Sequence, residues 1–259
     1  MEHVSVTRTD AVGRITMDRP ESNNSIDPAM SEQLHEAAIE LVEDETVRCI
    51  VLTGSGGTFN TGADLGSLSA DAGDAALIRS MAHQLHGTVS QLHRAPKPVV
   101  CGVNGVTAGG GIGLSLCGDV VLVAESARFE FAYPRIGLSA DGGSSYFLPR
   151  LVGLRRAQEI AFRDEPVGAE EAAEMGLATE AVPDEGFEDR LAEEAVRLAE
   201  GPTRAHAATK ALLRQSFDRQ LDEQMATEAA TIAGLTGTDD YRRGVEAFFD
   251  EGSPDFRGE

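Results

Sequence analysis

Short apolar runs, each followed by a glycine-rich turn and a helical pattern, recur along this chain and limit the folds that it can adopt. The runs are Cys49–Thr53, Pro98–Val103 and Asp119–Ala124, and their lengths and β-branched residues are typical of buried strands. Helical patterns cover residues 75–94 and 110–117 between them. Because parallel strands need crossover connections, the alternation predicts an α/β architecture with a parallel sheet covered by helices.

The N-terminal segment indicates a hairpin and then a capped helix. Val4–Arg8 and Gly13–Met17 alternate apolar and polar side chains on either side of a turn, as the two strands of a hairpin do. Asp27 and Pro28 are residue types preferred at the N-cap and first position of a helix. We therefore expect a helix that begins there and ends at about Asp44.

From Phe187 onward the pattern is almost wholly helical, with further helices predicted over residues 202–216, 220–233 and 239–250. We therefore divide the chain into a core over residues 1–186 and a C-terminal helical region over residues 187–259. From the sequence, the apolar faces of that region are equally suited to covering their own core and to packing against another subunit.

Acidic side chains dominate the charge balance, with 43 Asp and Glu against 22 Lys and Arg, a formal net charge of −21. This charge argues against nucleic acid or an anionic membrane as a partner, because phosphate binding needs a basic surface. Lysine occurs only at Lys97 and Lys210. We expect a protein adapted to high salt, where screening weakens repulsion between acidic groups. The alternative is an ordinary acidic enzyme.

The chain carries no run of 18 apolar residues and no basic-then-apolar N-terminus, so we expect a cytoplasmic protein without a membrane span. Cys49, Cys101 and Cys117 lie in apolar runs without CxxC or Cys/His spacing, which predicts buried thiols rather than a metal or redox site. His83 and His86 stand three residues apart on one predicted helix. We interpret them as exposed helix surface rather than as a metal pair.

Two glycine-rich segments about 45 residues apart, Thr58–Leu65 and Asn104–Gly113, carry the strongest indication of function. Glycine allows the main chain to approach a ligand closely or to take a positive φ. Two backbone N–H groups that converge on one carbonyl oxygen form an oxyanion hole. The segments contain no GxxxxGK[ST] motif, and Leu114 replaces the last glycine of GxGxxG, so they favour enolate or acyl chemistry over nucleotide binding.

Five segments also occur in an order and spacing that match one known family. They are Phe59–Leu65, Lys97–Gly105, Ala108–Gly111, Cys117–Asp119 and Leu148–Gly153. Together they resemble the enoyl-CoA hydratase/isomerase, or crotonase, family over about residues 4 to 250. The resemblance implies a crotonase-like ββα spiral with a C-terminal helical trimerisation region, and a homotrimer or dimer of trimers. It implies an acyl-CoA thioester as substrate and no separate cofactor, because coenzyme A enters as part of the substrate.

The same resemblance assigns roles within the site. The N–H groups of Ala63 and Gly110 are implied to hold the thioester oxygen, with Gly110 beginning a helix whose dipole also favours an anion there. Substrate contacts are expected at Arg19, Asn23, Asn60, Thr61, Gly62, Asp64, Leu65 and Gly109. Arg19 could instead be a solvated arginine near a turn, and for Asp64 we favour a structural role.

The chain departs from the hydratases of the family at both of their glutamates. The first of these positions is Gly113 and the second is Arg135, so efficient addition of water between two carboxylates is not expected. If the scaffold still positions water, Gly113→Glu should add some hydration.

Asp141, in Ser139–Pro149, resembles the single carboxylate of the isomerase branch, although Ala140 precedes it where that branch has proline. One carboxylate is enough to move a double bond, because a proton taken from one carbon can be returned to another. Asp141 could also cap a helix that starts near Gly143. Glu130 is a reserve candidate for the base.

The sequence thus favours an isomerase that transfers a proton through an oxyanion-stabilised thioester enolate. A hydratase using one carboxylate is the alternative within the family. A catalytically silent acyl-CoA-binding subunit is the alternative from another class.

Overall fold

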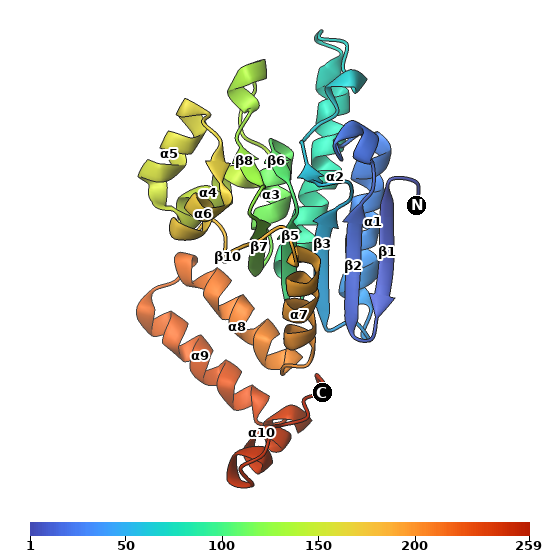
Figure 1. Cartoon of the computed structure of the whole chain (residues 1–259). Helices are drawn as coiled ribbons and strands as arrows, with labels where there is room; N and C mark the ends of the chain where they lie inside the picture. Colours follow the sequence, from blue (N-terminus) through green and yellow to red (C-terminus); the bar gives the residue numbers. More distant parts are fainter.

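A six-stranded sheet forms the centre of the molecule in the computed structural model, which describes all residues from Met1 to Glu259 (Figure 1). Its strands, in spatial order, are β1 (Val4–Thr9), β2 (Val12–Met17), β3 (Cys49–Gly54), β5 (Val99–Val103), β7 (Val120–Ala124) and β10 (Glu180–Val182). Only β1 runs antiparallel to its neighbour, since it forms the predicted hairpin with β2. The other neighbours are parallel, with Leu52 of β3 opposite Cys101 of β5.

A second, smaller sheet explains the spiral. Its strands are β4 (Thr58–Asn60), β6 (Val106–Ala108), β8 (Arg128–Glu130) and β9 (Val167–Gly168). Each of β3, β5 and β7 is followed by a strand of this sheet and then by a helix: α2 (Asp74–Arg94), α3 (Gly110–Leu116) and α4 (Ser144–Leu151). The repeated strand-strand-helix turn confirms the expected α/β spiral.

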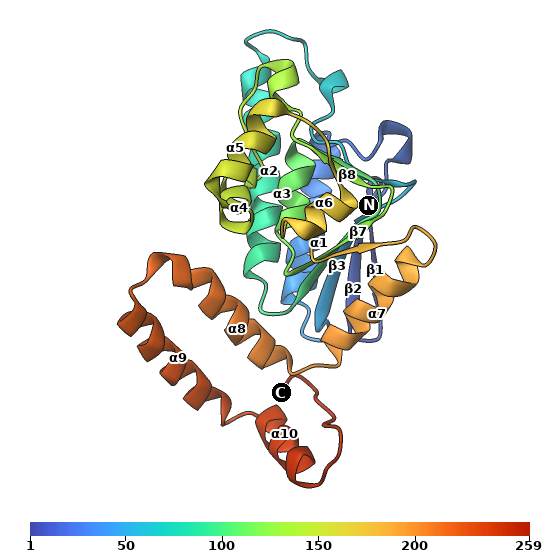
Figure 2. The same ribbon diagram turned by 60° about the vertical axis from the view of Figure 1, so that its left-hand side comes forward.

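Helices cover both faces of the main sheet. A Cβ at Gly13 would contact Leu41 of α1 (Pro28–Glu43), whereas a Cβ at Gly102 would contact Leu191 of α7 (Phe187–Ala199). Figure 2 shows α1, α2 and α3 on one side of the sheet and α7 on the other. The Asp27 side chain accepts a hydrogen bond from the Met30 N–H at 2.7 Å, so the predicted N-cap is confirmed.

The buried core holds all three cysteines as free thiols, as the sequence predicts. Cys101 and Cys49 lie on the neighbouring strands β5 and β3, and Cys117 ends α3. Burial raises the pKa of the Cys49 thiol to about 12. These thiols are therefore packing groups of the sheet and its cover. No helix is both long and apolar enough to cross a lipid bilayer.

The only two lysines cap helix ends inside the molecule. The Lys97 Nζ donates to the Leu41 and Asp44 carbonyl oxygens at 3.1 and 2.8 Å, at the end of α1. The Lys210 Nζ donates to the Leu92 carbonyl near the end of α2 and pairs with Asp119 at 2.7 Å. A cation at a helix C-terminus interacts favourably with the helix dipole. No lysine is left to neutralise the acidic surface.

The C-terminal helices differ in how they meet the core. The first, α7, packs on the sheet, although it lies beyond the predicted boundary at residue 186. α8 (Thr203–Gln215) and α9 (Leu221–Leu235) form a helical pair that reaches away from the sheet, followed by α10 (Asp239–Phe249). Large apolar side chains at least 65% exposed lie on or between these helices: Leu213, Phe217, Leu221, Ile232, Phe248 and Phe249.

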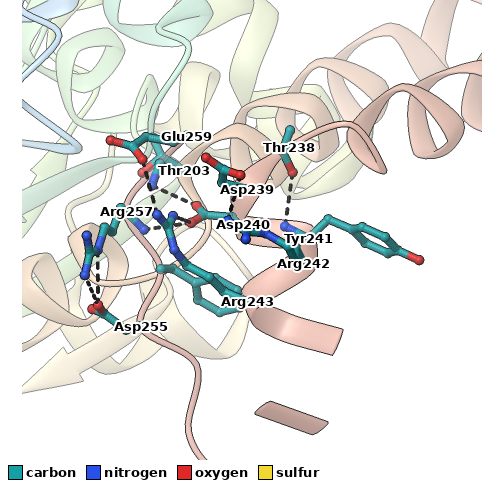
Figure 3. A network of polar contacts seen from close by, with 12 residues as sticks. Thr203, Thr238, Asp239, Asp240, Tyr241, Arg242, Arg243, Asp255, Arg257 and Glu259 are labelled. Atoms are coloured by element: carbon teal, nitrogen blue, oxygen red, sulfur yellow. Dashed lines mark hydrogen bonds and ion pairs between the residues drawn. The ribbon is translucent and has the colours of Figure 1, made fainter. Parts of the chain in front are cut away.

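Beyond α10 the chain returns to the core through a polar network around Asp240 (Figure 3). The buried Asp240 carboxylate accepts hydrogen bonds from the Arg257 and Gly258 backbone N–H groups at 2.8 and 2.7 Å. It also pairs with Arg243 at 2.9 Å. Arg48 donates to the Phe256 carbonyl oxygen at 3.0 Å. The last residues are therefore fixed against the start of β3 and the C-terminal helices.

Candidate active site

A cavity of about 650 Å³ opens between α2, the segment that follows β4, and the loop that leads to α4. Ile78, Met81 and Leu85 of α2 form one apolar wall. Ile136 and Leu138 line the cavity from the loop and are each about half exposed. An apolar cavity with a few polar groups is the usual form of a small-molecule site.

Two backbone N–H groups, those of Ala63 and Gly110, are free at this cavity. The Ile26 N–H donates to the Gly62 carbonyl at 2.7 Å, and the Asp64 N–H donates to the Ile26 carbonyl at 2.8 Å. Backbone groups of neighbouring residues in an extended segment point to opposite sides, so the Ala63 N–H faces away from Ile26. Gly110 is the first residue of α3, whose N–H has no acceptor within the helix. Both residues line the cavity.

Glycine is required beside each of these donors. Gly109 has φ 52° and ψ −124°, a backbone conformation that residues with a Cβ rarely adopt. Gly62 has φ 80°, and a Cβ there would lie 3.2 Å from the Gly110 nitrogen. The two glycine-rich segments are therefore in direct contact, and their small residues bring the two donors near each other at the cavity.

Asp141 reaches the cavity from a loop whose backbone is held in place. Its carbonyl oxygen accepts hydrogen bonds from the Tyr133 hydroxyl at 3.0 Å and from the Ser144 hydroxyl at 2.7 Å. Its side chain accepts no bond from the start of α4, because Gly143 is the N-cap residue and no side chain caps the helix. The capping alternative considered from the sequence is therefore not what the structure shows.

The Asp141 carboxylate instead meets a histidine from α2. The Asp141 Oδ1 lies 2.5 Å from the His86 Nε2, and the other carboxylate oxygen has no partner within the chain. From the sequence, His86 is interpreted only together with His83, as helix surface, without a link to Asp141. No pattern could have linked two residues 55 positions apart. Only the packing of α2 against the loop brings them together.

Of the predicted substrate contacts, Thr61, Gly62, Asp64, Leu65 and Gly109 line the cavity, together with Ala63, Gly110 and Asp141. Arg19, Asn23 and Asn60 do not. The Arg19 side chain is only 11% exposed, and its guanidinium lies 3.1 Å from the Asp64 carboxylate and 3.5 Å from that of Asp27. The structure thus places Arg19 among ion pairs beside the site, where it holds Asp64.

Asn23 and Asn60 both support the segment that carries Ala63. The Asn60 Oδ1 accepts a hydrogen bond from the Gly62 N–H at 2.9 Å, and its Nδ2 donates to the Asn24 carbonyl oxygen at 2.6 Å. The Asn23 carbonyl oxygen accepts a bond from the Thr61 hydroxyl at 3.1 Å. In this structure both residues contact the segment that carries Ala63, and their predicted contact with a substrate stays a prediction.

Glu130, the reserve candidate for a base, is engaged by two arginines. Arg135 and Arg128 lie 2.6 and 2.7 Å from its carboxylate oxygens, and the bond from Arg135 is the main cause that lowers the pKa of Glu130. Arg135 also pairs with Asp164 at 2.6 Å. Glu130 does not line the cavity. Both observations argue against Glu130 as the base.

Gly113 corrects one expectation from the sequence. The Gly142 carbonyl oxygen lies 1.7 Å from the place that a Cβ on Gly113 would occupy, so the position has no room for any side chain. The loop that carries Asp141 fills this space. Gly113→Glu would therefore fit only if this loop moved, which argues against the expected gain of hydration.

Comparison with known proteins agrees with this architecture. Residues 7–259 match the family model of enoyl-CoA hydratase/isomerase. The chain is 40% identical over 250 residues, 96% of each chain, to a Rhodobacter capsulatus protein named "Probable enoyl-CoA hydratase". It is 37% identical over 262 residues to the 1,2-epoxyphenylacetyl-CoA isomerase of Escherichia coli, covering 100% of this chain and 99% of the relative.

Solved structures give the same result. The enoyl-CoA hydratase/isomerase of Cupriavidus metallidurans superposes with a TM-score of 0.90 at 33% identity, covering 100% of this chain and 97% of the other. The chain thus belongs to the enoyl-CoA hydratase/isomerase family, whose enzymes act on CoA thioesters. The relatives carry both hydratase and isomerase names.

Proposed function

We propose that this enzyme moves a double bond along the acyl chain of a CoA thioester, with Asp141 as the single base. The observation that carries the proposal is the difference in hydrogen-bond partners between the two carboxylates that line the cavity, Asp64 and Asp141. Asp64 is engaged by Arg19 and by the Gly66 N–H. Asp141 keeps one carboxylate oxygen without a partner, so it alone can accept a proton from a bound ligand.

The reaction then needs only groups that the cavity offers. The Asp141 carboxylate takes a proton from the carbon next to the thioester, and the electron pair of that C–H bond moves onto the thioester oxygen. The Ala63 and Gly110 N–H groups stabilise the oxyanion, and a donor of this kind contributes about 3 kcal/mol in measured cases. Asp141 returns the proton to the carbon two positions further along, and the double bond has moved with no net gain or loss of atoms.

Hydration is the less suitable chemistry for this cavity. It requires a water molecule held and activated beside the double bond. Position 113 has no room for a side chain, and the Arg135 guanidinium is occupied by Glu130 and Asp164. Asp141 would have to orient the water alone. A silent binding subunit would have no need for a carboxylate beside the two N–H donors.

Incubation with 3-enoyl-CoA and, separately, with 2-enoyl-CoA, followed by separation of the products, tests the proposal. We expect interconversion of the two positional isomers and little 3-hydroxyacyl-CoA. Hydration as fast as isomerisation would favour the hydratase alternative. Binding of both thioesters without turnover would favour the silent subunit.

We also propose that three copies assemble through α8, α9 and α10. The exposed side chains that support this include Leu213, Phe217 and Ile232, which a single copy leaves open to water. Large apolar side chains that stay exposed on neighbouring helices are typical of an interface with another chain. Sedimentation equilibrium should give three or six times the mass of one chain, and a monomer at all concentrations would contradict the assembly.

A further inference from the structure

The contact between Asp141 and His86 gives a proton on Asp141 a second place to go besides the substrate. Of the Asp141 side chain, 34% is exposed, and of the His86 side chain 54%. Ala82 and Leu85 of α2 line the cavity, but His86 does not. The carboxylate therefore stands between the cavity on one side and a solvent-facing imidazole on the other.

We propose that His86 is a proton-exchange partner of Asp141, which connects the base to solvent during turnover; this rests on the proposed function. After Asp141 has taken the substrate proton, its carboxylic acid passes that proton to the His86 Nε2 across the 2.5 Å contact. Carboxylate and imidazolium result. The exposed imidazolium exchanges the proton with water, returns one to Asp141, and Asp141 delivers it to the substrate. One proton is taken and one is given back.

The geometry favours this route over direct exchange at the carboxylate. Asp141 lines the same cavity as Leu85 and Leu138, so an acyl group bound there would cover the cavity side of its carboxylate. The His86 side stays open, because the ring belongs to the exposed face of α2. The Asp141 backbone is fixed by Tyr133 and Ser144, so the carboxylate can contact both groups without moving its loop.

His86 therefore influences the fate of the proton rather than its removal. In a closed site the same proton would return to the substrate at the new carbon. With His86 present, return competes with exchange, and the product formed in D2O should carry deuterium at the carbon that receives the proton.

The test converts 3-enoyl-CoA in D2O and measures deuterium at C4 of the 2-enoyl-CoA product by mass spectrometry and NMR. His86→Gln keeps an N–H donor to Asp141 but cannot be protonated, so a purely orienting role would survive the change. We expect the deuterium fraction per product molecule to fall at least about fivefold in His86→Gln. His83→Gln, one turn earlier on the same exposed helix, should match the wild type. Imidazole added to His86→Ala should restore part of the deuterium.

Equal deuterium fractions in the wild type and His86→Gln, with double-bond migration intact in both, would overturn the exchange role alone. If the wild type moves no double bond, the proposed function fails and a second reaction decides about His86. Exchange of the α-protons of phenylacetyl-CoA with D2O needs the base but no migration. A rate at least about tenfold lower in His86→Gln would still support the inference. No exchange in the wild type, or equal rates, would contradict it.

Discussion

The Gly142 carbonyl oxygen occupies the space into which a side chain at Gly113 would project, at 1.7 Å from its Cβ position. This contact ties the first turns of α3, which supplies the Gly110 donor, to the loop that supplies Asp141. Glycine at position 113 is therefore required by the observed position of the loop that carries Asp141, and any side chain there would displace this loop.

Gly113→Ala should consequently destabilise the fold and displace Asp141. We expect the free energy of unfolding to fall by about 2–3 kcal/mol, because overpacking against backbone has no flexible neighbour to absorb it. Turnover should fall in the protein that remains folded. Gly234→Ala in α9 is the control, since a Cβ there meets nothing within 4 Å. Denaturant unfolding curves that coincide for wild type and Gly113→Ala would contradict the contact.

The proposed oxyanion role of the two N–H groups can be tested through Gly109, whose φ and ψ set the direction of the next peptide N–H. Gly109→Ala should turn the Gly110 N–H away and lower kcat about 10²- to 10³-fold, the effect of losing one such donor. Gly57→Ala is the matched control, because Gly57 also has a positive φ but lies in open space outside the cavity. Equal kcat losses in both variants would remove the special role of Gly109.

His93 predicts a pH dependence of stability that is separate from catalysis. Burial, helped by the nearby Arg214 and Lys210, lowers the pKa of His93 from 6.5 to about 4. The folded state thus keeps His93 neutral while the unfolded chain takes up a proton below pH 6.5. Stability contributed by the neutral ring is complete above pH 6.5 and is lost as the pH falls towards 4.

His93→Phe should remove this dependence, because phenylalanine cannot take up a proton. Its ring can keep the edge-to-face contact with Phe147, in which the ring centroids of His93 and Phe147 are now 5.1 Å apart. Relative to this variant, the wild type should lose about 1–3 kcal/mol between pH 7 and pH 4, allowing for partial solvent screening. Unfolding measured at both pH values checks the difference. A difference in stability that stays constant with pH would show that His93 titrates normally.

The acidic surface predicts a response to salt. The chain has 43 acidic side chains, while Lys97 is buried and Lys210 is engaged by Asp119, so arginine supplies nearly all of the positive charge at the surface. Screening shortens the range of repulsion from about 30 Å at 0.01 M salt to about 3 Å at 1 M. The Tm and the oligomer size should therefore both rise as sodium chloride goes from about 0.05 M to about 2 M. Melting curves and elution volumes that do not change would contradict adaptation to high salt.

The sequence predicted five of the six strands of the main sheet and the helices between them, because their patterns are local, but not β10. The predicted helix from Asp27 to about Asp44 is α1, and the run at Cys49–Thr53 is β3 with one more residue. The strands of the smaller sheet have only two or three residues each, too few for periodicity to show. These strands could not be predicted from the residues alone, and only the family resemblance implied the spiral.

The candidate site likewise has features that the sequence predicts and contacts that it does not. The donors at Ala63 and Gly110 and the carboxylate at Asp141 stand in recognisable motifs, and all three line one cavity. Contacts between segments far apart in the chain could not be predicted from local patterns. Neither the pairing of His86 with Asp141 nor the occupation of the Gly113 space by Gly142 could be predicted, since each depends on how a loop packs on a helix.

The most direct test of the central claim is the turnover of 3-enoyl-CoA by Asp141→Asn, measured together with its affinity for the same thioester. Asparagine has nearly the same shape but cannot take up the proton, so kcat should fall at least about a hundredfold while binding stays within a few-fold of the wild type. The Ala63 and Gly110 donors do not depend on that carboxylate. Isomerisation at the wild-type rate in Asp141→Asn would show that another group is the base and would contradict the account.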